Sequence, residues 1–135
     1  MAFPQNLGIV SDQVPLLSNL TTAENIALIR QYHGGLSTMR AMQLARTYLL
    51  RAGIDMLAEI HVDRLDHEQR LAVKFLRAMM FPGAVVAVVK PLQQMPEETA
   101  CSILRHLVET FEDSYRQCHI FELSWHADKL KELNG

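Results

Sequence analysis

The chain has 135 residues, is 49% hydrophobic and carries a formal net charge of −2, which suits one domain with a buried core. This balance, without a run of like charges, gives no basis for binding nucleic acid or inserting directly into a membrane. Cys101 and Cys118 fit neither a disulfide framework nor a zinc motif, and the N-terminus lacks a secretory apolar segment. We therefore expect a cytoplasmic protein without a metal site.

The first half of the chain predicts one short strand followed by helices. Residues 7–10, LGIV, are typical of a strand. Thr21 and Glu24 have capping-box spacing at the start of a helix that stops at Gly34 and Gly35. A second helix begins at Ser37, ends at Gly53 and places four apolar side chains on one stripe: Met39, Met42, Ala45 and Leu49.

A third long helix is predicted after a brief helical piece at residues 54–60. Asp66 and Gln69 again have capping-box spacing. Behind them, one face of the helix carries large apolar side chains at helical intervals, among them Leu71, Phe75 and Met79. This face should pack on the core.

The second half of the chain predicts strands alternating with helices. Residues 84–89, AVVAVV, have the uninterrupted apolar character of a central parallel strand covered on both faces. A helix with Pro96 in its first turn, a strand at residues 119–124 and a short helix at 126–135 follow. The order indicates an α/β fold with a small parallel sheet of about three strands and right-handed crossovers.

Three segments carry a resemblance to a known family. "IVSDQVPLLSNLTTAENIAL" is similar to "VFQEPALLPNLTVRENIAL", "LDHEQRLAVKFLRAM" is similar to "LSGGQRQRVAIARAL", and "IFELSWHAD" is similar to "VIVVTHD". The right-hand patterns are those of the ATP-binding subunits of ABC transporters. The chain thus resembles the C-terminal two-thirds of that P-loop NTPase-like domain, beginning after its phosphate loop.

The resemblance implies how the single domain, residues 1–135, is divided. Residues 12–80 match the family's helical subdomain, and residues 7–10 and 81–135 match its sheet core. The strand at 119–124 then lies at a sheet edge, beside the place of the phosphate-loop strand. His119 and Glu122 give this strand the mixed polarity of an edge.

The positions that do chemistry in the family are mostly altered in this sequence. Asp12 stands at the position of the first-loop glutamine, Val89 at that of the Mg²⁺-binding aspartate and Lys90 at that of the catalytic glutamate. Valine cannot ligate a hard cation, and a lysine ammonium is not a base at neutral pH. No Gly-Lys pair of a phosphate loop is present, and only His126 keeps the switch-histidine position.

The signature segment is altered as well. In place of Leu-Ser-Gly-Gly-Gln stand Leu65, Asp66, His67, Glu68 and Gln69, which put two carboxylates where the family binds phosphate. The resemblance therefore implies a protein that neither binds nor hydrolyses ATP, has no cofactor and is not an enzyme.

The family also implies a partner surface. Its first loop contacts the membrane permease, so Leu16, Leu17 and Leu20 are the candidate partner-binding residues. We expect a protein-interaction or regulatory component of ABC transport, bound to a permease or to another ABC ATPase chain and peripheral to the inner membrane through that partner.

Two alternatives stay open. In the first, the chain is half of an ATPase completed in trans by a chain with the phosphate loop. In the second, it is a small scaffold or peptide-binding module that binds a peptide through its helical part or forms a homodimer through residues 119–124. Cys101 and Cys118 have no general base at motif spacing, so we do not expect a nucleophile at either position.

Overall fold

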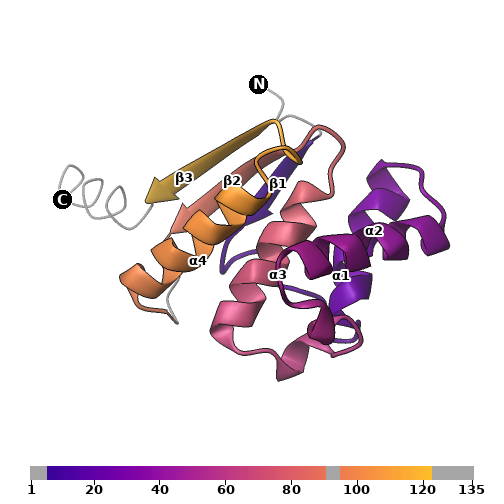
Figure 1. Cartoon of the computed structure of the whole chain (residues 1–135), viewed down its shortest axis with the longest axis horizontal. Coiled ribbons are helices and arrows are strands. Elements are labelled where there is room, and N and C mark those ends of the chain that lie inside the picture. Colours follow the sequence, from indigo (N-terminus) through magenta and orange to yellow (C-terminus); the bar gives the residue numbers. More distant parts are fainter. Residues whose placement is uncertain (1–5, 91–94, 123–135) are drawn as a thin grey trace, which may run out of the picture.

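The fold is a three-stranded parallel sheet with four α-helices, seen in a computed structural model that describes residues 6–90 and 95–122 (Figure 1). The strands lie in the order in which they occur in the chain, β1-β2-β3. Their bounds are β1 (Leu7–Val10), β2 (Val85–Lys90) and β3 (Gln117–Glu122). This confirms the predicted α/β class with a small parallel sheet.

The helices are α1 (Thr22–His33), α2 (Thr38–Arg51), α3 (His67–Met79) and α4 (Glu97–Thr110), with short 3-10 helices η1 (Asp55–Leu57) and η2 (Val62–Arg64). In Figure 1, α1 and α2 lie away from the sheet, α4 covers it, and α3 lies between the two groups. One hydrophobic cluster contains side chains of the outer helices and of the sheet, including Ile26 of α1 and Val86 of β2. None of the described helices is long and apolar enough to cross a bilayer.

The capping residues predicted from the sequence are confirmed. Thr21 and Asp66 both form complete capping boxes, with Glu24 and Gln69 respectively. The side chain of Ser37 caps α2 by accepting a hydrogen bond from the Arg40 amide. These caps satisfy amide groups that a helix start would otherwise leave unpaired, which is why their spacing locates the helices well.

Helices α3 and α4 cover the same face of the sheet. Each strand of the sheet is added on the same side of the strand before it. In that arrangement, right-handed crossovers place all the connecting helices on one face of the sheet. The burial of β2 alternates accordingly: Val86, Val88 and Lys90 are buried, whereas the residues between them are half-buried. The expectation that this strand is covered on both faces was therefore wrong, because the connections that the structure describes cross one face only.

Several other expectations need correction. Met39, predicted on the buried stripe of α2, is 72% exposed, because the buried face of that helix consists of Ala41, Ala45, Tyr48 and Leu49. Pro96 is the residue that caps α4 and precedes its first turn. The strand predicted at 84–89 is shifted by one residue, and β3 begins two residues before 119.

The expected edge strand is found at the edge. Within residues 6–90 and 95–122, β3 pairs with β2 alone, in register from Val85↔Gln117 to Lys90↔Glu122. Ile120 and Phe121 are 49% and 48% exposed. Pairing of this edge with a second copy stays a prediction, and residues 123–124 and the helix expected at 126–135 lie outside the described residues.

Gly8 is the point of closest approach between the sheet and α3. A Cβ atom built on Gly8 would lie 2.2 Å from the backbone carbonyl oxygen of Ala78. No real Cβ tolerates that distance, and backbone cannot rotate away as a side chain can. Only glycine therefore lets α3 pack directly on β1.

We predict that Gly8→Ala destabilises the protein by about 3 kcal/mol or more, because α3 must move away from β1. Gly35→Ala is the matched control, since its Cβ has open space and only a positive φ of 65° opposes it, costing about 1 kcal/mol. Urea unfolding of both variants measures the difference. Equal losses of stability would contradict the direct helix–strand contact.

Candidate functional site

The candidate site lies at the carboxyl end of β2. In parallel sheets, ligands usually bind beside the carboxyl ends of the strands. Lys90 is the last residue of the strand and is 7% exposed, on the face that α4 covers. Val89 precedes it and points to the opposite face, where it is half-buried. The two residues expected to mark an emptied catalytic site therefore face opposite sides of the sheet.

Lys90 is held by the first two turns of α4. Its ammonium forms an ion pair with the carboxylate of Glu97 and lies 3.5 Å from the sulfur of Cys101. Hydrogen bonding to Glu97 raises the pKa of Lys90, although burial acts in the opposite direction. The same hydrogen bond lowers the pKa of Glu97, whose side chain is 64% exposed. The pair therefore stays charged at neutral pH.

The loop after β1 is held by two cations of α3. Lys74 donates a hydrogen bond to the carbonyl of Ser11 at 3.1 Å. Burial lowers the pKa of Lys74, and the nearby negative charge of Asp12 opposes that effect. Arg77 donates to the carbonyls of Val14 and Pro15 at 3.0 and 2.8 Å. These contacts fix the loop that carries Asp12, whose own side chain is exposed.

The signature-like segment forms the start of α3. Asp66 accepts a hydrogen bond from the Gln69 amide at 2.7 Å, and the Gln69 side chain accepts one from the Asp66 amide at 3.0 Å. Leu65 is buried, while His67 and Glu68 are exposed in the first turn. The helix start thus carries its own carboxylate cap, which takes the place an external anion would need.

The three candidate partner-binding leucines differ in their surroundings. Leu17 is 45% exposed, whereas Leu16 and Leu20 are partly buried. The backbone of Leu17 is clamped by the buried side chain of Asn25, which accepts from the Leu17 amide at 2.7 Å and donates to its carbonyl at 3.1 Å. Each leucine lines a different cavity, so the structure does not gather them into one pocket.

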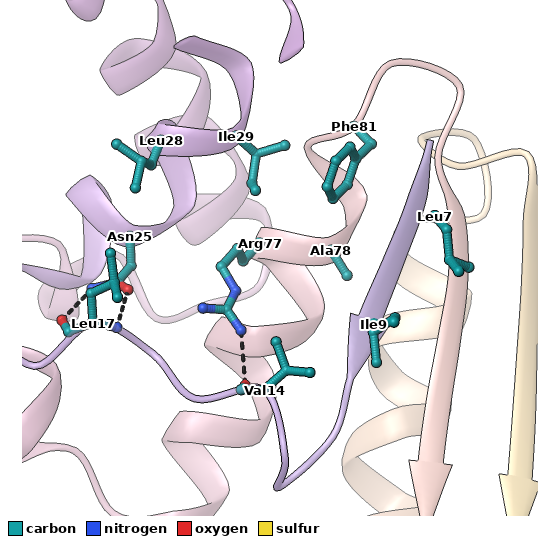
Figure 2. A pocket seen from close by; sticks show the side chains of 10 residues that line it. All are labelled: Leu7, Ile9, Val14, Leu17, Asn25, Leu28, Ile29, Arg77, Ala78 and Phe81. Carbon is teal, nitrogen blue, oxygen red and sulfur yellow. Dashed lines mark hydrogen bonds between the residues drawn. The ribbon is translucent and has the colours of Figure 1, made fainter. Parts of the chain in front are cut away.

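Leu17 lines an apolar cavity between α1, α3 and β1. The cavity has a volume of about 300 Å³, and its walls are Leu7, Ile9, Val14, Leu17, Asn25, Leu28, Ile29, Arg77, Ala78 and Phe81. Figure 2 shows the guanidinium of Arg77 projecting across it from α3 toward Val14. Burial lowers the pKa of Arg77 without discharging it at neutral pH. The cavity is therefore apolar with one fixed cation.

The chemistry available at the end of β2 is limited. A valine has no ligand atom, and an ammonium repels a divalent cation rather than binding it. Lys90 with a raised pKa does not act as a general base at neutral pH. His126 lies outside the described residues. At the end of β2, the two positions that the resemblance matches to the family's carboxylates are Val89 and Lys90. Neither of them therefore supplies a carboxylate.

Sequence reasoning missed the contacts made by charged side chains across elements. Glu97 and Cys101 are one helical turn apart on α4, and that spacing was the available signal for their contact at 3.5 Å. Nothing local indicated that Lys90 would join them. The anchoring roles of Lys74 and Arg77 were equally hidden, because both act over more than 60 residues of sequence.

We predict that Lys90→Glu destabilises the protein by about 3 kcal/mol, because it places a second carboxylate, itself buried, beside Glu97. Lys90→Met keeps the volume without the charge and should cost less. The penalty of Lys90→Glu should shrink as the pH falls toward 4, where both carboxyl groups take up protons. Thermal unfolding at pH 4 and pH 7 measures this, and a penalty independent of pH would contradict the contact.

Comparisons with known proteins place these features in context. No family model matches the chain. It is 26% identical over 132 residues, 96% of its length, to the macrolide export ATP-binding/permease protein MacB of Aggregatibacter actinomycetemcomitans. It is 29% identical over 106 residues, 76% of its length, to MacB of Salmonella typhi. The chain spans only 20% and 16% of these relatives.

Solved structures agree on the fold. The dimeric ATP-binding cassette MJ0796 in a post-hydrolysis state with ADP and Pi matches with a TM-score of 0.64 and 24% identity, over 87% of this chain and 51% of that one. A second dimeric structure of the same bacterial ABC transporter cassette gives a TM-score of 0.63 over 85% of this chain. Over most of its length, the chain is thus similar in sequence to MacB and similar in fold to an ATP-binding cassette of ABC transporters.

Proposed function

We propose that this chain is a non-catalytic relative of ABC ATP-binding cassettes that acts through protein contacts. The observation that carries the proposal is the state of Lys90. Its ammonium is buried at the end of β2 and ion-paired with Glu97, at the position where the family resemblance puts a catalytic glutamate. A cassette that hydrolyses ATP needs a carboxylate there to orient water.

Electrostatics at this end of the sheet supports the same proposal. The γ-phosphate of ATP is transferred with the help of Mg²⁺, which needs oxygen ligands from the protein. Val89 supplies none, and removing Lys90 from its ion pair would leave a buried charge without compensation.

The start of α3 supports it independently. A helix N-terminus binds phosphate when its amide groups are free and no negative charge competes. In this chain Asp66 already occupies the Gln69 amide, and Glu68 adds a second carboxylate in the first turn. A phosphate would have to displace the cap against two like charges.

The proposed partner is an ABC permease or another ABC ATPase chain. MacB carries both ATP-binding and permease in its name, and the solved cassettes are dimers. We propose that this chain meets such a partner through the surface around Leu17, which would hold it at the inner membrane without crossing it. The apolar cavity and the exposed Leu17 side chain give this surface the area that a permease segment could fill.

The first prediction is that MgATP does not stabilise the protein. A ligand at about 100 times its dissociation constant adds about 2.7 kcal/mol of stability, which would raise Tm by several degrees. We expect no such shift with 1 mM MgATP, which is roughly 100 times a dissociation constant of about 10 μM, and no displaced amide peaks in NMR spectra. The cassette MJ0796 serves as the positive control, and a rise of several degrees in this chain would overturn the proposal.

The second prediction concerns the partner surface. Leu17→Asp should abolish co-purification with a co-expressed ABC permease, because it puts a charge in an apolar contact while the Asn25 clamp on the backbone remains. Leu50→Asp is the matched control, since Leu50 is 63% exposed on α2, away from this cavity. Equal retention of the permease by both variants would count against the surface.

A further inference from the structure

The cluster of Lys90, Glu97 and Cys101 has a property that the proposed function does not use. We propose that Cys101 is an oxidation site for small hydroperoxides, with Lys90 activating the thiol and retaining the oxidised product while Glu97 positions both side chains. The inference rests on the geometry of the three side chains and holds whether or not the chain acts through a permease.

Two opposite charges flank the sulfur of Cys101. The thiol donates a hydrogen bond to the Glu97 carboxylate at 3.5 Å, and the Lys90 ammonium lies 3.5 Å from the same sulfur. A nearby cation stabilises a thiolate, which is the reactive form of cysteine. Glu97 orients the thiol by accepting its hydrogen bond and also holds the Lys90 ammonium in place.

Burial makes the cation effective. Lys90 has a side-chain exposure of only 8%, so water screens its charge weakly. Cys101 itself is half-buried, and the carboxylate beside it belongs to a side chain that is 64% exposed. A half-buried side chain is open in part to a solute as small as hydrogen peroxide.

The reaction is a two-electron oxidation. The thiolate sulfur attacks one peroxide oxygen; the O–O bond breaks, and the departing hydroxide takes up the proton that the thiol released and leaves as water. The thiol and hydrogen peroxide thus become a sulfenic acid and water, with sulfur oxidised and peroxide reduced. The new S–O group can accept a hydrogen bond from Lys90, which retains the product.

Cys118 provides an internal comparison. It lies on β3, is half-buried and has no ammonium or carboxylate in hydrogen-bond contact among the residues that the structure describes. Burial raises the pKa of this thiol. The same chain thus holds one cysteine with charged partners and one without, and the proposal predicts that they differ in reactivity.

The experiment treats the full chain with hydrogen peroxide in the presence of a 1,3-dione that traps sulfenic acid, and peptide mass spectrometry reads each cysteine. We expect trapping at Cys101 at least about tenfold faster than at Cys118. We also expect Cys101 to be trapped faster in the folded chain than in the urea-unfolded chain. Mere exposure cannot give that second result, because unfolding exposes a residue further.

Variants test the role of the cation. Lys90→Met should slow trapping at Cys101 about tenfold and leave Cys118 unchanged. Glu98→Gln, which alters an exposed carboxylate next to Glu97, should change neither. The proposal is overturned if Cys101 is trapped more slowly in the folded than in the unfolded chain. If Lys90→Met prevents folding, the test is the rate of trapping at Cys101 in the unaltered chain, compared between its folded and its urea-unfolded state.

Discussion

The whole arrangement depends on the direct contact between β1 and α3. Gly8 and the backbone of Ala78 come so close that no side chain fits between them. From this contact the same helix extends to the helical layer, and its Arg77 and Lys74 hold the loop that follows β1. One glycine thereby sets the distance between sheet and helices, and with it the shape of the cavity beside Leu17.

The end of β2 carries a buried charge that the fold compensates within the chain. A buried carboxylate at this position would need Mg²⁺ or a proton to offset its charge, whereas Lys90 is offset by Glu97 within the chain itself. The ion pair therefore joins the end of the strand to the first turn of α4.

Much of the fold could be predicted because its signals are local. The capping boxes at Thr21 and Asp66 and the apolar run of β2 each depend on a few consecutive residues. The exposure of Met39 could not be predicted, since it depends on which side of α2 meets α1. The site was predictable only as a set of substituted positions, because the contact of Lys90 with Cys101 depends on how β2 and α4 pack.

The order of the strands has a consequence for how the protein folds during its synthesis. β2, α4 and β3 are contiguous, whereas the hydrogen bond from Asn6 to Gly83 at the start of the β1–β2 pair spans 77 residues. During synthesis, β1 leaves the ribosome long before its neighbour exists, with Leu7, Ile9 and Val10 unpaired. Closing that long loop is the costliest step in assembling the sheet. Until β2 has been synthesised, β1 of the nascent chain has to avoid pairing with the strand edges of other molecules.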